Sequence, residues 1–336
     1  NEMVKKTKLA SHDVRFIQAA PCTYTRLGAR FETRANDMLK SMTNEREAQI
    51  GWNPLGGGLH RTLNRFEKCK KFLELDWTRY DGTIPEQLMH LVDELRLWAF
   101  EGNESDAQTY ANYRKMITNR LVAFANGKIY HIKQGNPSGQ FSTSVDNCMV
   151  QTVLIYLEQK YWQQHLGNQC TMEEIRAKYV SMSYGDDRIT GYLDPTDCPD
   201  GSWLVEFYKN KFGMWVKPEN CKTSNKLEGL SFCGMTFRKK KGRFVPCYNS
   251  KKIYASLANP AKPAQDFETL GNKMNSHKLL VALDDSMEAS EIRRRAAIYE
   301  QITGERLIDV KTAKEIMMGG PKDTRQGSFD DKSLEV

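Results

Sequence analysis

The sequence predicts an α+β fold, in which a mainly antiparallel sheet with flanking helices precedes a helical C-terminal region. Three observations predict it. Residues 70–77 form a short apolar run that leads at once into a helical pattern. Residues 175–193 and 229–248 each have the pattern of two short strands joined by a tight turn, which makes them β-hairpins. From about residue 250 the apolar spacing is helical.

Composition places the chain among ordinary globular proteins. Its 336 residues, 40% hydrophobic and 10% aromatic, are enough for two or three packed subdomains and exclude a disordered chain. The net charge of +7 is moderate, but basic clusters at 4–8 and 238–243 would attract polyanions. Eight cysteines without a C-x-x-C pair indicate a reduced, intracellular protein without structural zinc.

Targeting and membrane signals are missing from the sequence. There is no signal peptide and no apolar run of the roughly 18 residues that a membrane span needs. Because the first residue is Asn1, we expect the chain to be a fragment or a processed product, with further sequence upstream.

The first strand, "KKFLELDW" at 70–77, precedes an amphipathic helix. We expect Thr83 to cap this helix, Pro85 to lie in its first turn and Gly102 to end it. The apolar residues at helical spacing are Leu88, Leu91, Val92, Leu95 and Trp98.

The remaining segments follow in order. Residues 103–137 are polar and mixed, and end in a loop rich in Gly, Asn and Pro. Residues 142–162 predict a long helix that is apolar around much of its circumference and therefore largely buried. Residues 202–213 predict a helix that ends at its glycine. Two more helices are predicted within 287–304 and 310–321, and the second stops at a proline.

Carboxylates gather where two of the predicted strands end. Asp76 and Asp81 follow the first strand, and Asp186 with Asp187 forms the tip of the first hairpin. Adjacent carboxylates repel each other, and a hydrated turn would be enough to explain the pair alone. If the strands are neighbours, however, three carboxylates converge within reach of two Mg²⁺ ions, which prefer hard oxygen ligands. Two ions about 3.5–4 Å apart can clamp an in-line phosphoryl transfer.

Four motif-like segments follow one another along the chain: "ELDWTRYDGTIP" at 74–85, "GNPSGQFSTSVDNCMV" at 135–150, "YGDD" at 184–187 and "FCGMTF" at 232–237. They resemble motifs A, B, C and E of the RNA-dependent RNA polymerases of positive-strand RNA viruses. Their sequences are most similar to those of the astrovirus polymerases. The likeness extends upstream to "KTKLASHDVRFIQAAP" at 6–21, which is similar to motif F. Each motif alone is a weak signal, but together and in order they are specific.

The resemblance implies a right-hand polymerase, with an antiparallel palm sheet and flanking helices, partial fingers and a helical thumb. The implied domains are partial fingers at 1–50, palm with motif A at 51–102, a fingers insertion at 103–137, palm with motifs B to E at 138–249, and thumb with C-terminal tail at 250–336.

The resemblance also implies the activity. The chain would copy an RNA template by two-metal nucleotidyl transfer from NTPs to an RNA 3′-hydroxyl, using two Mg²⁺ or Mn²⁺ ions. Its partners would be template and nascent RNA, NTPs and other viral replication proteins, in the host cytoplasm at membrane-associated replication complexes.

Two other functions stay open at this point. A reverse transcriptase would also use a palm and two metals, but it predicts a bulky side chain at the 2′-position, where this chain has Asp81 and Asn147. An RNA-binding module that is inactive without upstream fingers predicts salt-dependent RNA binding and no nucleotide incorporation.

The acidic motifs receive roles from the same resemblance. Asp76 and Asp186 would be the principal metal ligands. Asp187 would be an outer, weaker partner, or else a solvated turn residue. Asp81 would face the ribose of the incoming nucleotide, and it also suits a helix N-terminus, where the dipole favours an acid.

Motif B supplies the expected sugar contacts. Ser138, which would bind the nucleotide, and Gly139, which would contact RNA, end a flexible loop. Thr143 and Asn147 lie one turn apart on the following helix and share a face. With Asp81, Asn147 would select ribonucleotides, because a 2′-hydroxyl both donates and accepts hydrogen bonds. Thr143 has an alternative interpretation as an ordinary helix-face hydroxyl.

Basic residues complete the implied site. Similarity to motif F assigns Lys8 and Arg15 to the triphosphate, since Arg can fork onto two oxygens. Lys5 and Lys6 would contact template phosphates or form a solvated face.

Motifs D and E add further candidates. The motif D segment at 212–225 offers two lysines as the general acid for pyrophosphate; Lys222, after the proline, is favoured over Lys217. The motif E hairpin would hold the nascent 3′ end with Cys233, and with Arg238 and Lys239 in place of the basic residue that relatives carry straight after the turn.

Overall fold

The computed structural model describes residues 10, 17–43, 45–124, 126–260 and 262–319. The described chain separates into two compact units. We call them the sheet unit, the described residues within 6–52 and 66–227, and the C-terminal unit, the described residues within 53–65 and 228–319. The domain boundaries expected from the resemblance stay predictions.

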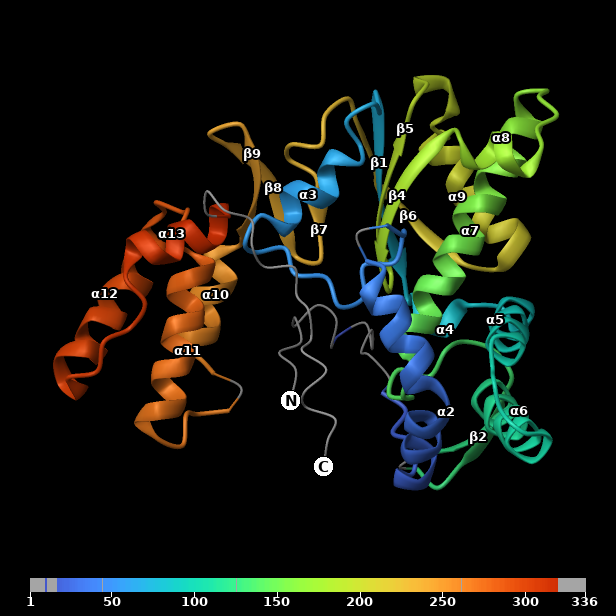
Figure 1. The fold of residues 1–336 in the computed structure, drawn as a ribbon, viewed down its shortest axis with the longest axis horizontal. Coiled ribbons are helices and arrows are strands. Elements are labelled where there is room, and N and C mark those ends of the chain that lie inside the picture. Colours follow the sequence, from blue (N-terminus) through green and yellow to red (C-terminus); the bar gives the residue numbers. More distant parts are fainter. Residues whose placement is uncertain (1–9, 11–16, 44, 125, 261, 320–336) are drawn as a thin grey trace. The chain divides into compact units, whose positions relative to one another are not determined.

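The sheet unit is built on a four-stranded antiparallel sheet in the order β4-β5-β1-β6 (Figure 1). Its strands are β1 (Lys71–Thr78), β4 (Tyr179–Tyr184), β5 (Asp187–Tyr192) and β6 (Trp215–Ser224). The first predicted strand and the first predicted hairpin are therefore confirmed. The sequence analysis missed β6, a mostly exposed edge strand that contains Pro218, a residue tolerated in sheets mainly at edges.

Helices α7 (Thr143–His165), α9 (Gly201–Phe212) and α5 (Glu86–Trp98) form the main core with this sheet. Figure 1 shows α7 and α9 beside the strands. Side chains alternate along β1, so that Leu73, Leu75 and Trp77 lie in this core while Asp76 lies on the opposite face and is exposed. The short helices α8 (Met172–Arg176) and η1 (Pro195–Asp197) flank β4 and β5 in the sequence.

A second helical layer belongs to the same unit. It consists of α2 (Cys22–Ser41), α6 (Glu104–Thr118) and a hairpin of β2 (Arg120–Ala123) with β3 (Ile129–Ile132). The segment that the sequence left as polar and mixed thus contains a helix, because Tyr110, Tyr113 and Ile117 recur on one face of α6 and pack around Phe31 of α2. The rings of Phe31 and Tyr110 stack with centroids 5.1 Å apart.

The start of α5 differs from the prediction. Thr83 is not its cap, because it ends a separate turn of helix, α4 (Tyr80–Thr83), and its hydroxyl donates to the carbonyl oxygens of Arg79 and Tyr80 at 3.2 and 3.1 Å. Pro85 is the N-cap of α5 rather than a first-turn residue. The helix ends at Trp98, before Gly102.

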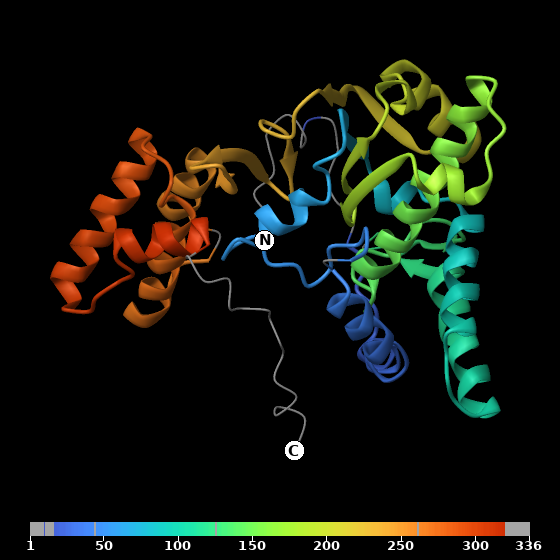
Figure 2. The same ribbon diagram turned by 45° about the horizontal axis from the view of Figure 1, so that its top comes forward.

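The C-terminal unit combines a small sheet with helices (Figure 2, orange and red, with residues 53–65 in blue). Its sheet has the order β7-β8-β9, and the predicted second hairpin is β8 with β9, closed by a basic turn at Lys241. The elements are α3 (Gly58–Asn64), β7 (Ser231–Phe232), β8 (Met235–Lys240), β9 (Arg243–Tyr248), α10 (Ser250–Ala258), α11 (Phe267–Leu280), α12 (Met287–Thr303) and α13 (Val310–Met318).

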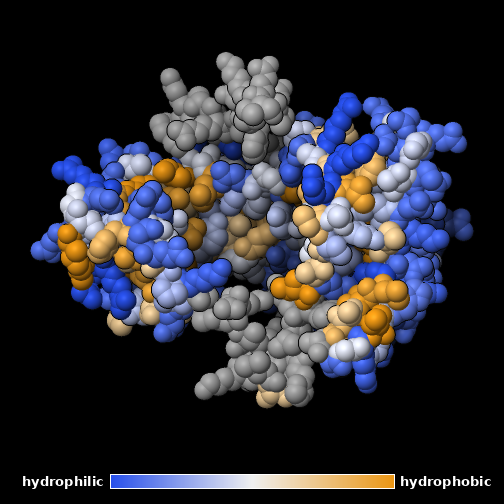
Figure 3. All heavy atoms as spheres, turned by 90° about the horizontal axis from the view of Figure 1, so that it is seen from below, coloured by the Kyte–Doolittle hydropathy of each residue, from blue (hydrophilic) through white to orange (hydrophobic). Residues whose placement is uncertain are grey.

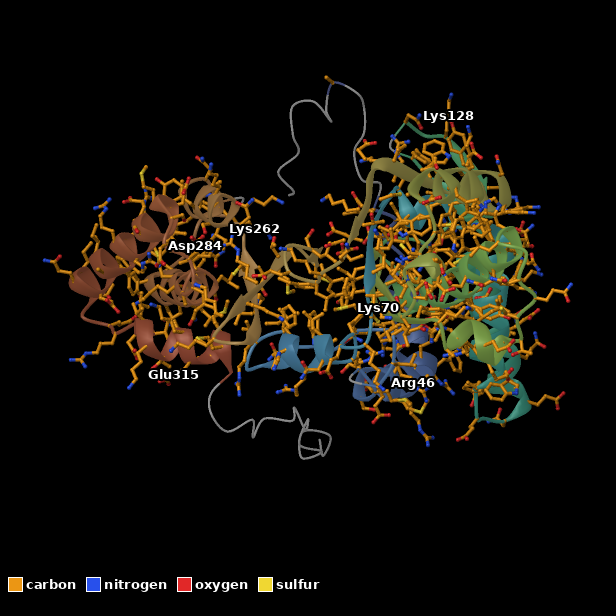
Figure 4. The ribbon with its side chains drawn as sticks, turned by 90° about the horizontal axis from the view of Figure 1, so that it is seen from above. Arg46, Lys70, Lys128, Lys262, Asp284 and Glu315 are labelled. Carbon is orange, nitrogen blue, oxygen red and sulfur yellow. The ribbon has the colours of Figure 1, made fainter. Side chains whose placement is uncertain are left out.

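Polar caps fix the helices of this unit. Asp284, labelled in Figure 4, accepts a hydrogen bond from the Ser250 hydroxyl at the start of α10 and another from the backbone N–H of Ser286 at 2.9 Å. Ser286 in turn caps α12 by accepting from the N–H of Ala289 at 3.2 Å. The Ser286 cap satisfies a helix N–H that would otherwise lack an intrahelical partner, and Asp284 links the starts of α10 and α12.

The surface is mixed, and on the face drawn in Figure 3 apolar patches are interrupted by hydrophilic side chains. Within the described ranges, no helix is both long and apolar enough to cross a membrane. All eight cysteines are free thiols.

The charge buried under the sheet is expected to control its stability. Arg188 of β5 is fully buried and donates to Glu158 of α7 at 2.8 Å. We expect Glu158→Ala to lower the free energy of unfolding by about 3–5 kcal/mol in urea denaturation, because it leaves the buried Arg188 guanidinium without its charged partner.

The matched control is Asp37→Ala, which removes the exposed pair with Lys40 at 2.8 Å in the same unit. It should cost less than about 1 kcal/mol. Equal stability of the two variants would contradict the importance of the buried pair.

Candidate active site

The pairing of β1 with β5 brings the acidic motifs together. Leu75 lies opposite Arg188, so the register continued by one residue sets Asp76 opposite Asp187. Asp186 occupies the two-residue loop that Tyr184 and Asp187 close as paired residues. Gly185 begins this loop with φ +62°, the left-handed conformation that such a tight hairpin requires at its first position.

Helix α7 holds this turn from the side. The N–H of Gly185 donates to the Cys148 sulfur at 3.3 Å, and the Gln151 amide donates to the carbonyl of Asp186 at 3.2 Å. Burial raises the pKa of Cys148 to about 12, so it remains a neutral thiol. Neither residue was predicted from the sequence, although their three-residue spacing on a predicted buried helix was a usable signal.

The carboxylates themselves face water. Asp76, Asp186 and Asp187 are all exposed, at the ends of neighbouring strands. Nowhere in the described residues do three or more His, Cys, Asp or Glu side chains form a ready metal-binding group. The donor chemistry nevertheless fits Mg²⁺, which binds through one or two carboxylates and takes its other ligands from water and phosphates. Their exposure leaves these carboxylates accessible to ions from solvent.

Asp81 lies beside this edge and is held by two donors. The Asn147 amide donates to its Oδ1 at 2.7 Å, and the Ser138 hydroxyl donates to its Oδ2. The Tyr80 hydroxyl donates to the backbone carbonyl of Asn147 at 3.0 Å, which ties α4 to α7. The structure thus brings together three of the residues predicted to contact the nucleotide; their role toward the ribose stays a prediction.

The motif B loop is closed by Thr143 and Gly139. The Thr143 hydroxyl donates to the carbonyl of Pro137 at 2.8 Å, and its contact with the nucleotide stays a prediction. Gly139 has φ +132°, and a Cβ there would lie 2.5 Å from the carbonyl oxygen of Gln18. Any other residue at 139 would push the loop away from Gln18.

The two candidate lysines lie on β6, next to β1. Lys222 is opposite Glu74, and its ammonium pairs with the Glu74 carboxylate at 3.4 Å, on the sheet face that carries Asp76. Lys217 directly follows the paired residue Val216, where the register shifts in an irregular stretch. Both remain candidates for the proton donor.

The predicted RNA contacts of motif E lie in the C-terminal unit. Cys233 occupies the turn between β7 and β8 with φ +49°. Arg238 and Lys239 are exposed on β8, and the Lys239 ammonium lies 4.8 Å from the centroid of the Phe244 ring. Their RNA-binding role stays a prediction.

Four of the predicted basic contacts lie outside the described residues: Lys5, Lys6, Lys8 and Arg15.

A buried ionic cluster lies behind the motif B loop, and the sequence analysis missed it. Asp146 of α7 accepts from Arg96 of α5 at 2.6 Å and from Arg114 of α6 at 3.0 Å. Arg114 also binds Glu32 of α2 at 2.9 Å and Asp93 of α5 at 2.7 Å. Four helices therefore share one set of charges. An acid in a helix predicted to be buried was the available signal, since buried charges need partners.

The fold matches a solved polymerase structure. The Sicinivirus 3Dpol RNA dependent RNA polymerase aligns with a TM-score of 0.72 and 18% sequence identity, covering 92% of this chain and 63% of that chain. The chain has the right-hand polymerase fold, which confirms the predicted fold class.

The family follows from the sequence comparisons. The family model for viral RNA-dependent RNA polymerase matches residues 1–299, and the chain belongs to that family. It is similar to the non-structural polyprotein 1AB of Avian nephritis virus 1, 38% identical over 92% of this chain and 21% of the relative. The same polyprotein of Turkey astrovirus 2 is 36% identical over 83% and 18%, and that of Human astrovirus-1 is 36% identical over 84% and 19%. The chain thus spans about a fifth of the length of these relatives.

The buried cluster should make the sheet unit sensitive to acid. Burial alone would raise the pKa of Asp146, but Arg114 and Arg96 outweigh it and hold the pKa below its ordinary value. Its ionised form therefore stabilises the fold fully above the pKa of the unfolded chain, about 3.9, and this contribution is lost as pH falls through the folded pKa.

We expect Asp146→Asn to lower stability at pH 7 and to flatten the fall in melting temperature below about pH 4. Melting of both proteins followed by circular dichroism from pH 7 to pH 3 measures this. If the melting temperature of the variant fell as steeply below pH 4 as that of the wild type, the stabilising role of ionised Asp146 would be contradicted.

Proposed function

We propose that the chain is the catalytic part of an RNA-directed RNA polymerase, which extends an RNA 3′-hydroxyl with NTPs on an RNA template to replicate and transcribe a viral RNA genome. One observation carries the proposal: the register of β1 against β5 sets Asp76 beside the Asp186–Asp187 turn, with Asp81 held next to them by Asn147 and Ser138. Membership of the polymerase family supports it.

The exposed carboxylates suit metal binding. Asp76 and Asp186 would hold two Mg²⁺ or Mn²⁺ ions, with Asp187 as the outer partner. Such ions, when bound, stabilise the charge on the attacking and leaving oxygens of nucleotidyl transfer. Asp81, Asn147 and Ser138 would orient the ribose, because a deoxy sugar would leave their polar groups unpaired.

The remaining roles concern protons and polyanions. Lys222 would deliver a proton to the departing pyrophosphate, and Lys8, Arg15 and Thr143 would help bind the nucleotide. RNA would contact the other predicted residues: Lys5, Lys6, Gly139, Cys233, Arg238 and Lys239.

The polyprotein relatives suggest the setting. We propose that the chain works with other viral replication proteins, in the host cytoplasm at membrane-associated replication complexes. Co-purification of the chain with its polyprotein neighbours from infected cells would test this.

Removal of a metal ligand should abolish catalysis without unfolding. We expect Asp76→Ala and Asp186→Ala each to reduce template-directed NTP incorporation more than about 100-fold, since even indirect partners of a bound metal matter by about 10–100-fold. Both residues are exposed, so the melting temperature should hardly change.

Asp106→Ala on α6, which removes an exposed ion pair with Arg30 of α2, is the matched control and should keep activity. Substantial NTP incorporation by either the Asp76 or the Asp186 variant would overturn the assignment of these residues as metal ligands. Salt-dependent RNA binding by the wild type without incorporation, in Mg²⁺ or in Mn²⁺, would overturn the function.

The two lysines can be separated by paired substitutions. We expect Lys222→Leu to slow single-nucleotide incorporation by about 100-fold or more, as removal of a general acid does, and Lys217→Leu to change it little. Rapid-quench measurement of one addition step gives both rates. The reverse order would assign the proton donor to Lys217.

A further inference from the structure

Three side-chain amides form a continuous row between two carboxylates. Gln140 donates from Nε2 both to Asp146 Oδ2 at 2.8 Å and to Asn136 Oδ1 at 3.0 Å. Asn136 donates from Nδ2 to Asn147 Oδ1 at 2.8 Å, and Asn147 donates to Asp81 Oδ1 at 2.7 Å. The row thus runs from the buried ionic cluster to the carboxylate that faces the predicted sugar site.

The direction in which the amides of this row donate is set by backbone groups that can only donate or only accept a hydrogen bond. A primary amide has a donor end and an acceptor end of nearly the same shape, so hydrogen bonds decide its orientation. The backbone N–H of Ser142 can only donate, and it binds Gln140 Oε1 at 2.8 Å. The backbone carbonyl of Thr143 can only accept, and it receives Asn136 Nδ2 at 3.0 Å. Gln140 and Asn136 are therefore each fixed in one orientation.

Asn147 takes its orientation from Asn136. Because Asn136 presents an N–H to Asn147 Oδ1, the Nδ2 group of Asn147 must point to Asp81. The opposite orientation would set an amide oxygen against the Asp81 carboxylate, and two acceptors repel. Asn136 and Asn147 are 2% and 4% exposed, so water cannot easily replace the missing donor.

We propose that Asn136 is a positioning residue for sugar selection. It orients the Asn147 amide so that Asp81 is held by donors from Asn147 and Ser138 and presents its carboxylate to a ribose 2′-hydroxyl. The inference rests on the proposed polymerase function and adds a residue that touches neither substrate nor metal.

The test compares ribonucleotide and 2′-deoxyribonucleotide incorporation on one primed RNA template. Asn136→Asp keeps the shape and the acceptor for Gln140 but cannot donate to Asn147. Without this donor, Asn147 loses its fixed orientation and with it the hydrogen bond to the charged Asp81 carboxylate. We therefore expect kcat/KM for ATP to fall about tenfold or more, and kcat/KM for dATP to change less than about twofold. The ratio of the two constants should therefore fall about tenfold.

A second variant and a double-mutant cycle separate positioning from structure. Asn136→Ala removes the donor without adding charge and should lower the ratio similarly. In an Asn147→Ala background, either substitution at 136 should leave the ratio unchanged, because Asn136 acts through Asn147.

The control is Asn168→Asp, which removes an amide-to-amide hydrogen bond from an exposed asparagine to Gln163 (2.9 Å) just after α7. It should keep the wild-type ratio. A wild-type ratio in Asn136→Ala, an equal loss for both nucleotides, or additive effects in the cycle would each overturn the proposal. Absence of incorporation by the wild type would instead overturn the polymerase function itself.

Discussion

The antiparallel register of β1 against β5 is the constraint on which the rest of the site depends. Side chains on a strand alternate between faces, so a slip of one residue would turn Asp76 into the apolar core and Leu75 out to water. The register is enforced from the core side, where Leu75 lies opposite Arg188 and Arg188 is bound to Glu158 of α7. A buried charge with a fixed partner tolerates no such slip, so the interior of the unit determines where the exposed acids stand.

The same helix that fixes the register also carries Asn147, one of the predicted sugar contacts. Along α7, Asn147 reaches Asp81, Cys148 and Gln151 hold the Gly185–Asp186 turn, and Glu158 binds Arg188 farther on. One rigid element thus positions both acidic motifs. This explains why a helix with so little apolar periodicity is nevertheless buried: many of its buried positions bear polar groups whose partners come from the sheet and the neighbouring loops.

Sequence reasoning succeeded where a local pattern carried the information. The strand at 70–77 and the acidic hairpin tip were predictable, because apolar runs and turn residues act over a few positions. It failed where the deciding contact is distant. The edge strand β6 contains Pro218 and exposed polar residues, so only its pairing with β1 makes it a strand. The partners of Gln140 and Asn136 depend on the closed loop, and no spacing rule predicts which end of an amide faces which neighbour.

The carboxylates of the sheet unit differ in burial in a way that matches different tasks. Asp146 is fully enclosed and bound by two guanidinium groups, so it stays ionised at neutral pH and can orient the amides beside it. Asp81 is partly exposed and held at both oxygens, which gives a fixed acceptor for a neutral hydroxyl. Asp76 and Asp186 are exposed at strand ends, where ligands can exchange. The exposed acids can exchange ligands, as the proposed metal role requires, whereas the fixed position of Asp81 suits the proposed contact with the sugar. The row of three amides links the two kinds of carboxylate. It extends the fixed geometry of the buried ionic cluster at Asp146 to Asp81 at the exposed edge, through side chains that are themselves uncharged.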